Sequence, residues 1–207
     1  MQDEPKHIPG DIWEARWKDA GQKEKITRLG RLMFRAKIKA LRKALSGTEV
    51  QSVLDVGSGL GYILGFLQRE GFDVLGIDTS PSAIEYCRSK GLNAILKKLE
   101  EIGERYDLVV SDGLLEHLLN FEPYAQKMMK ISRKSIILIQ PNHESFRGNT
   151  LAFLAELFRS GINVYEYNYR IRDFVVVFEK NGFKLRRNLP VFGNVFRLLL
   201  FERIDKE

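Results

Sequence analysis

The sequence predicts an α/β fold in which helices cover a doubly wound, mostly parallel β-sheet. Three observations carry this prediction. Short runs rich in Val, Ile and Leu show no polar alternation, which is typical of strands buried on both faces. Helix-like segments alternate with these runs, as a parallel sheet requires. A glycine-dense turn, GSGLG at residues 57–61, follows the first run and opens the next helix, where such sheets bind their ligands.

The first part of the chain has a helical pattern, from about Asp11 to Ala44. Apolar residues recur there at i, i+4, i+7 and i+11 from Phe34 to Leu45, which marks one buried stripe. We expect residues 1–48 to form an N-terminal helical extension that serves as a lid. Residues 49–207 then form the main domain, with an insert at about 143–170.

Seven strands and five further helices are expected in the main domain. The strands are Ser52–Val56, Phe72–Ile77, Asn93–Leu96, Asp107–Val110, Ser135–Ile139, Phe183–Arg187 and Val195–Glu202, the last two joined by a turn with Pro190 and Gly193. The helices are Tyr62–Glu70, Pro81–Lys90, Glu122–Ile131, Asp173–Lys180 and, in the insert, Ser145–Ser160.

Basic residues are concentrated near the N-terminus. The chain of 207 residues has a formal net charge of +6, and residues 1–50 hold twelve Lys or Arg against seven Asp or Glu. Between Lys23 and Lys43, nine basic residues meet one acid. This segment is either a solvated helix face or a surface for phosphate, nucleic acid or anionic lipid.

The cellular location is expected to be the cytoplasm. No apolar run approaches the roughly 20 residues that cross a bilayer. The N-terminal stretch MQDEPKHIPG lacks the basic and apolar regions of a secretory signal. The single cysteine, Cys87, excludes an internal disulfide and a cysteine-cluster metal site, and its apolar neighbours predict a core residue.

Three kinds of ligand compete for the glycine turn. A P-loop needs a Lys after the glycines, and none is present. A dinucleotide fingerprint needs glycine where the bulky Tyr62 stands. The spacing D-x-G-x-G-x-G is complete in Asp55, Gly57, Gly59 and Gly61. Because a carboxylate there repels pyrophosphate and attracts an ammonium group, this spacing favours S-adenosylmethionine.

A second carboxylate follows the second strand. Asp78 lies 21 residues after Gly57 and can accept hydrogen bonds from both hydroxyls of a ribose. NAD and S-adenosylmethionine both carry that ribose. The alternative is that Asp78 is only a turn or helix-capping residue.

Three blocks of sequence resemble the class I S-adenosylmethionine-dependent methyltransferases, above all the small-molecule type with a bare catalytic domain. They are VLDVGSGLGY (53–62), VLGIDTSPSAIEYCR (74–88) and YDLVVSDGLLEHL (106–118). The resemblance implies a Rossmann-like seven-stranded sheet, S-adenosylmethionine as cofactor and S-adenosylhomocysteine as product.

The resemblance also implies which residues would hold the cofactor. Asp55 and the turn Gly57, Ser58, Gly59 and Gly61 would bind the methionine moiety, and Asp78 the ribose. Thr79 would lie along the ribose and adenine edge, and Ser111 and Asp112 beneath the sulfonium. One departure concerns adenine: relatives commonly have an acid followed by a small residue where Lys98 and Leu99 stand. Either backbone atoms and Leu99 hold the ring, or Glu100 makes the contact.

Two histidines are the candidate catalytic residues: His117, beyond the fourth strand, and His143, beyond the fifth. Either could accept a proton from a hydroxyl acceptor. Glu116 is expected to be a capping or structural acid. Trp13, Arg16 and Trp17 either close over the cofactor or simply pack the first helix, and the aromatic residues of the insert either line an acceptor pocket or complete the core.

Methyl transfer to a small molecule, by in-line transfer, is therefore the leading function. The alternatives are an RNA methyltransferase using the basic segment, a non-catalytic cofactor-binding protein and a lipid-modifying enzyme on an anionic surface.

Overall fold

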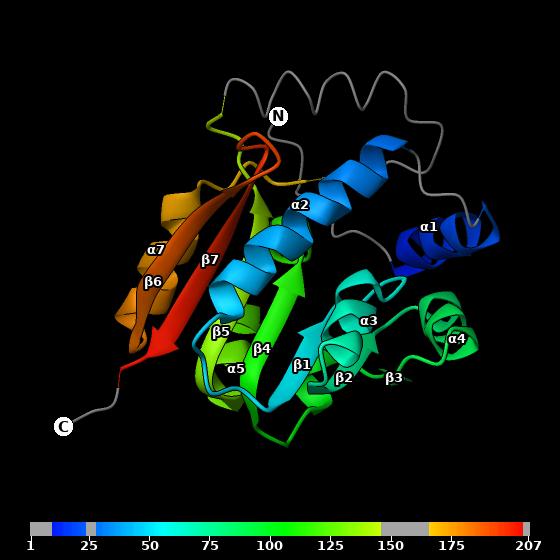
Figure 1. Cartoon of the computed structure of the whole chain (residues 1–207), viewed down its shortest axis with the longest axis horizontal. Coiled ribbons are helices and arrows are strands. Elements are labelled where there is room, and N and C mark those ends of the chain that lie inside the picture. The colour runs from blue at the N-terminus through cyan, green and yellow to red at the C-terminus, as the bar shows by residue number, and fades with distance from the viewer. Residues whose placement is uncertain (1–9, 24–27, 146–165, 205–207) are drawn as a thin grey trace, which may run out of the picture.

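The fold is a three-layer α/β/α sandwich. The computed structural model describes residues 10–23, 28–145 and 166–204 (Figure 1). Its seven-stranded sheet has the order β3-β2-β1-β4-β5-β7-β6. All pairs are parallel except those that β7 makes with β5 and β6. The predicted fold class, a doubly wound and mostly parallel seven-stranded sheet, is confirmed.

The elements follow the predicted order. The strands are β1 (Ser52–Val56), β2 (Asp73–Asp78), β3 (Ala94–Leu96), β4 (Tyr106–Asp112), β5 (Ser132–Pro141), β6 (Phe183–Val191) and β7 (Phe196–Arg203). The helices are α1 (Gly10–Lys23), α2 (Arg28–Leu45), α3 (Tyr62–Arg69), α4 (Pro81–Ser89), η1 (Leu99–Glu101), η2 (Leu115–His117), α5 (Glu122–Ile131) and α7 (Ile171–Lys180).

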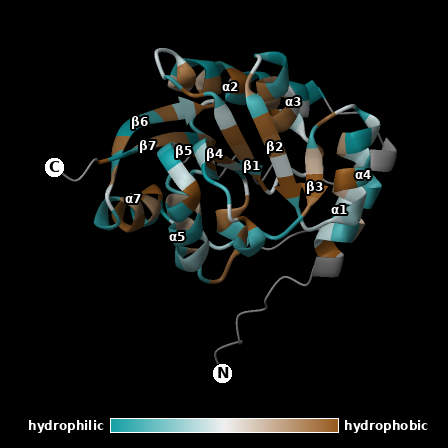
Figure 2. Ribbon diagram, turned by 90° about the horizontal axis from the view of Figure 1, so that it is seen from below, coloured by the Kyte–Doolittle hydropathy of each residue, from teal (hydrophilic) through white to brown (hydrophobic). Residues whose placement is uncertain are grey.

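Two apolar clusters hold the layers together. One joins α2, α3 and α4 to one face of the sheet, with Leu41 and Leu64 fully buried. The other joins α5 and α7 to the opposite face, with Phe174 and Phe178 at its centre. Figure 2 shows apolar residues along the central strands, which agrees with burial on both faces.

The turn that we expected to contain Pro190 begins only after Val191, because β6 continues through Pro190 to Val191. Proline is tolerated there because β6 is an edge strand, where an N–H can be spared. The helical pattern over 11–44 contains two described helices, α1 and α2. The helix expected over 145–160 lies almost entirely outside the described residues, and the domain division at residue 48 stays a prediction.

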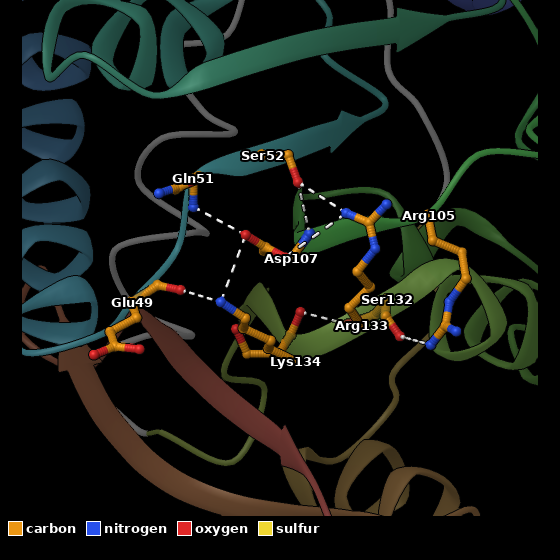
Figure 3. A network of polar contacts seen from close by, with 9 residues as sticks. Glu49, Gln51, Ser52, Arg105, Asp107, Ser132, Arg133 and Lys134 are labelled. Carbon is orange, nitrogen blue, oxygen red and sulfur yellow. Dashed lines mark hydrogen bonds and ion pairs between the residues drawn. The ribbon is translucent and has the colours of Figure 1, made fainter.

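A polar network fixes the edge of the sheet where β1 and β4 begin (Figure 3). Asp107 accepts a hydrogen bond from the Gln51 amide at 3.1 Å and lies 3.7 Å from both Arg133 and Lys134. Burial opposes ionisation of Asp107, but these hydrogen bonds and cations outweigh it and lower its pKa. The Asp107 carboxylate is therefore paired with two cations where β1 and β4 begin.

None of the described helices is both long enough and apolar enough to span a bilayer.

Candidate functional site

The carboxyl ends of β1, β2 and β4 lie side by side, and together with the glycine turn they form the candidate site, which we call the cleft. The chain crosses from β1 to α3 through the glycine turn, whose Gly57, Gly59 and Gly61 all have positive φ, at 71°, 50° and 72°. The amides of Gly57 and Ser58 both donate to the Ile77 carbonyl of β2, at 2.9 and 3.0 Å. These bonds hold the turn against the neighbouring strand, at the point where the sheet order reverses.

A side chain at each of the three glycines of the turn would meet a different neighbour. A Cβ on Gly61 would stand 2.5 Å from Leu92 and 2.8 Å from Cys87, so this glycine allows close helix packing. A Cβ on Gly57 would meet Leu114 at 3.3 Å. A Cβ on Gly59 would stand 2.8 Å from the Trp17 ring. Cys87 is fully buried, as predicted, and its thiol donates to the Gly59 carbonyl at 3.3 Å.

Asp78 ends β2 and faces the same turn. One of its oxygens accepts from the Gly59 amide at 2.8 Å and the other from the Ser80 amide at 2.9 Å. Each oxygen keeps further capacity for a hydroxyl donor. Burial raises the pKa of Asp78, although these amide hydrogen bonds oppose the shift. Asp78 thus links the glycine turn to the start of α4, where the Ser80 hydroxyl caps the helix.

Asp55 is the most buried acid of the cleft, with 2% of its surface exposed. Its Oδ2 has no hydrogen-bond partner among the described residues, and the same holds for the nearby Ser58 hydroxyl. Burial, and then the neighbouring Asp112 and Asp78 carboxylates, raise the pKa of Asp55 to about 8. Ionisation of Asp55 is therefore disfavoured in this structure, and a positively charged ligand beside it would favour the carboxylate.

Replacing Asp55 with asparagine should make the stability less dependent on pH. The folded-state pKa of about 8 lies far above the ordinary value of an aspartate, so protonation of Asp55 stabilises the folded chain at low pH. That contribution is lost as the pH rises through 8. We expect the melting temperature of the variant, measured by calorimetry, to rise relative to that of the native chain between pH 5 and 8. At pH 8 it should be about 5 °C higher. A difference that is constant across this range would contradict the assignment.

Asp112 forms an ion pair that the sequence did not predict. Lys37 of α2 donates to both of its carboxylate oxygens, at 2.7 and 2.9 Å, and its ammonium lies 4.5 Å from the centre of the Phe196 ring. Lys37 was grouped with the basic segment. A signal was present, since a period of 3.6 residues places Lys37 between Phe34 and Leu41, on the apolar stripe.

Helix α1 packs beside α4 (Figure 2). Trp17 covers Gly59, Trp13 stacks on Trp17 with ring centres 5.8 Å apart, and Arg16 lies over both rings at 5.5 and 5.7 Å. Glu14 accepts hydrogen bonds from the Ser80 hydroxyl and from both the amide and the hydroxyl of Ser82.

His117 joins this cluster from the other side of the cleft. It is 8% exposed, and its ring meets Trp13 edge-on with the ring centres 4.8 Å apart. A chain of contacts therefore runs from Gly59 through Trp17 and Trp13 to His117, which unites the glycine turn with the first candidate base.

Glu116, next to His117, is buried, and its expected role as a capping or structural acid stays a prediction. Its Oε2 has no hydrogen-bond partner in the described part of the chain, and its side chain caps no described helix. Burial raises the pKa of Glu116 to about 8, and the Glu166 and Asp112 carboxylates add to this shift. Glu116 is therefore a buried carboxyl that can hold a proton near neutral pH.

The remaining predicted site residues lie around the cleft or one strand away. Ser111 is fully buried and donates to the Val56 carbonyl at 3.1 Å, so it ties β4 to β1. Thr79 is exposed beside Asp78. Lys98 is exposed at the start of η1, whereas Leu99 is 5% exposed and belongs to the core. His143 is half-buried after β5, one strand farther from the turn than His117.

The residues of the cleft fit S-adenosylmethionine on three observations. Asp55 has a buried oxygen without a described partner, Asp78 offers two oxygens beside the turn, and only glycine fits at residue 59 beneath Trp17. Carboxylates suit the ammonium and sulfonium charges, and paired oxygens suit a ribose diol.

Comparisons with known proteins point to a family of proteins. A family model described as a methyltransferase domain matches residues 29–188. Ubiquinone biosynthesis O-methyltransferases of Rickettsia prowazekii and Rickettsia bellii are 25% and 24% identical over 122 and 148 residues, which are 55% and 67% of this chain. The chain spans 48% and 62% of the length of these two relatives.

A solved structure has a similar fold. Magnesium protoporphyrin IX methyltransferase from Synechocystis PCC 6803, with bound S-adenosylhomocysteine, superposes with a TM-score of 0.73 at 16% identity, covering 93% of this chain and 97% of that one. At this identity the likeness establishes the fold alone. The family match covers far more than half of the chain and agrees with the three blocks that carried the resemblance. The chain therefore belongs to the methyltransferase domain family, and its fold is that of the class I S-adenosylmethionine-dependent methyltransferases.

Proposed function

We propose that the protein transfers the methyl group of S-adenosylmethionine to a hydroxyl group of a small molecule. The observation that carries the cofactor assignment is the set of three carboxyls, Asp55, Asp78 and Asp112, at adjacent strand ends around a turn that excludes a Cβ at Gly59. The names of the curated relatives, which describe O-methyltransferases, support an oxygen acceptor.

The chain's own residues would bind and orient the reactants. Asp78 would accept the ribose hydroxyls, and Asp55 would accept the ammonium group of the methionine moiety. The bound cofactor supplies an activated methyl group, so the protein needs to align the acceptor and exclude water. Trp13 and Trp17 of α1 cover the cleft and would keep water away from it.

A hydroxyl acceptor must lose its proton during transfer, and His117 is our candidate for receiving it. It lies in the aromatic cluster of the cleft, whereas His143 lies one strand away and remains the second candidate.

The acceptor class can be tested with S-adenosylmethionine that carries a radioactive methyl group. The full chain is incubated with a cell extract divided by size into metabolites and macromolecules. We expect label in the metabolite fraction, and none when the Asp78→Ala variant replaces the native chain. Label confined to RNA or protein would contradict a small-molecule acceptor.

An RNA acceptor is the second candidate, because one face of α2 is basic and exposed. Arg28, Arg31, Arg35 and Lys39 are all exposed on this face. If RNA binds there, affinity for bulk RNA should fall steeply between 50 and 200 mM salt, by roughly 10²-fold or more, because phosphate contacts release counterions. Reversing the charges of Arg31 and Arg35 should remove the binding in a filter assay. Salt-independent or unchanged binding would rule this surface out.

A further inference from the structure

A second cavity lies outside the cleft, between the start of α7 and the hairpin of β6 and β7. It has a volume of about 480 Å³. Two arginines, Arg172 and Arg197, line it together with the polar side chains of Asn142, Asn188 and Asn194. Glu144 is the acid of the lining and is exposed. The lining thus has more positive than negative charge, opposite to the acidic cleft.

Arg197 is held in one orientation by neutral groups. Its Nε donates to the Asn188 side-chain oxygen at 2.7 Å, Nη2 to the Asn188 carbonyl at 3.0 Å and Nη1 to the Asn194 side-chain oxygen at 2.8 Å. A guanidinium has five N–H donors, so these contacts leave one donor on each terminal nitrogen. Two such donors side by side match the paired oxygens of a carboxylate or phosphate.

The environment of Arg197 favours an anion. In the described part of the chain no carboxylate lies within ion-pair distance of its guanidinium. Burial lowers the pKa of Arg197, which shows that its charge is partly removed from water. A desolvated cation with only neutral partners is costly, and an anion would offset that cost.

The hairpin of β6 and β7 forms part of the cavity wall and orients Arg197. Asn194 has a φ of 74°, a left-handed conformation that asparagine tolerates, and this turn aims its side chain at Arg197. Asn142 donates its side-chain amide to the Asn194 carbonyl at 3.2 Å, and its backbone amide to the Val195 carbonyl at 2.9 Å. The end of β5 is therefore bonded to the wall of the cavity.

The cavity lies at the same end of the sheet as the cleft, because Asn142 follows β5 and Asp112 ends β4. Arg197 is on β7, two strands from β4, where Asp112 lies in the cleft. Strand spacing makes this separation about 10 Å.

We propose that the Arg197 cavity binds an acidic group, a carboxylate or a phosphate, of the methyl acceptor. This inference rests on the proposed function, and it defines the acceptor as an acid. Arg197 is the principal ligand, and Arg172 adds a second positive charge at the cavity.

The test measures binding of simple anions to the full chain, by nuclear magnetic resonance titration of the arginine Nε–H signals. The probes are benzoate, its neutral analogue benzamide, and inorganic phosphate. We expect saturable shifts of the Arg197 signal with benzoate or phosphate and none with benzamide. Stronger binding of benzoate than of phosphate assigns a carboxylate, and the reverse order assigns a phosphate.

Variants distinguish anion binding at Arg197 from a general effect of positive charge on the surface. Arg197→Gln should weaken anion binding at least tenfold, and Asn188→Asp, which places a carboxylate against Arg197, should do the same while keeping the arginine. The control is Arg186→Gln, since Arg186 is exposed on β6 and pairs with Glu202 at 2.8 Å; its effect should stay within twofold. Equal binding by native and Asn188→Asp chains, or no saturable binding of either anion, would overturn the proposal.

Binding of S-adenosylhomocysteine is measured on the same samples. It should be unchanged in Arg197→Gln and Asn188→Asp, which also shows that both variants are folded. Loss of anion binding with intact cofactor binding concerns the cavity alone. A native chain that binds anions but not S-adenosylhomocysteine would contradict the proposed function instead.

Discussion

Replacing Asp78 with alanine is expected to weaken binding of S-adenosylhomocysteine at least tenfold, measured by titration calorimetry. The side chain offers two acceptor oxygens beside the glycine turn and already orders the Gly59 and Ser80 amides at 2.8 and 2.9 Å. Alanine removes the ribose acceptors and the support of the turn together. A tenfold loss corresponds to about 1.4 kcal/mol, a modest figure for charge-assisted hydrogen bonds.

The matched control for this change is Asp73→Ala. Asp73 begins the same strand, β2, but it is exposed and lies at the amino end of the strand, away from the cleft. We expect its substitution to leave cofactor affinity within twofold of the native value. Unchanged affinity in Asp78→Ala would refute the ribose assignment, and equal losses in both variants would indicate a general effect on β2.

The second large effect is expected from Gly59→Ala, which should lower cofactor affinity at least tenfold and displace α1. The new Cβ would stand 2.8 Å from the Trp17 ring, on the surface where the cofactor has to approach the backbone. Because Trp13 and Trp17 are the two tryptophans of the chain, displacement of α1 should shift the tryptophan emission to longer wavelength.

Gly71→Ala provides the control for backbone strain. Gly71 has a φ of 89°, but a Cβ there would meet nothing within 4 Å. Both alanines should cost about 1–2 kcal/mol of unfolding free energy, because the left-handed region disfavours a side chain. Cofactor binding and emission should change only in Gly59→Ala. Equal losses of affinity in the two variants would show that strain, and not space in the cleft, is responsible.

The fold was predictable because its signals are local and consistent. The strand Ser52–Val56 and the helix Glu122–Ile131 have the predicted bounds, since an unbroken apolar run and a clear helical period define each of them. Pro190 was placed in a turn because proline usually ends a strand. Its tolerance depends on β6 being an edge strand, which is a property of the whole sheet.

The site was predictable only in part. The glycines and Asp78 belong to a short pattern whose spacing has a physical reason, so the sequence identifies them. Glu14 and Lys37 reach the cleft from helices that have no such pattern, and their partners, Ser82 and Asp112, are 68 and 75 residues away along the chain. The hydrogen bonds that hold Arg197 likewise come from a hairpin turn and an edge strand, which spacing alone does not bring together.

The edge strand β6 also affects how copies of the protein meet. An exposed strand edge invites pairing with a second chain, and proteins prevent this with charge, proline and irregular register. All three are present here: Lys184 and Arg186 are exposed, Pro190 lacks an N–H, and the register shifts between Leu185 and Arg187. The other edge, β3, has only three residues. Neither edge favours a continuous sheet between two copies, so the described fold resists association by strand addition.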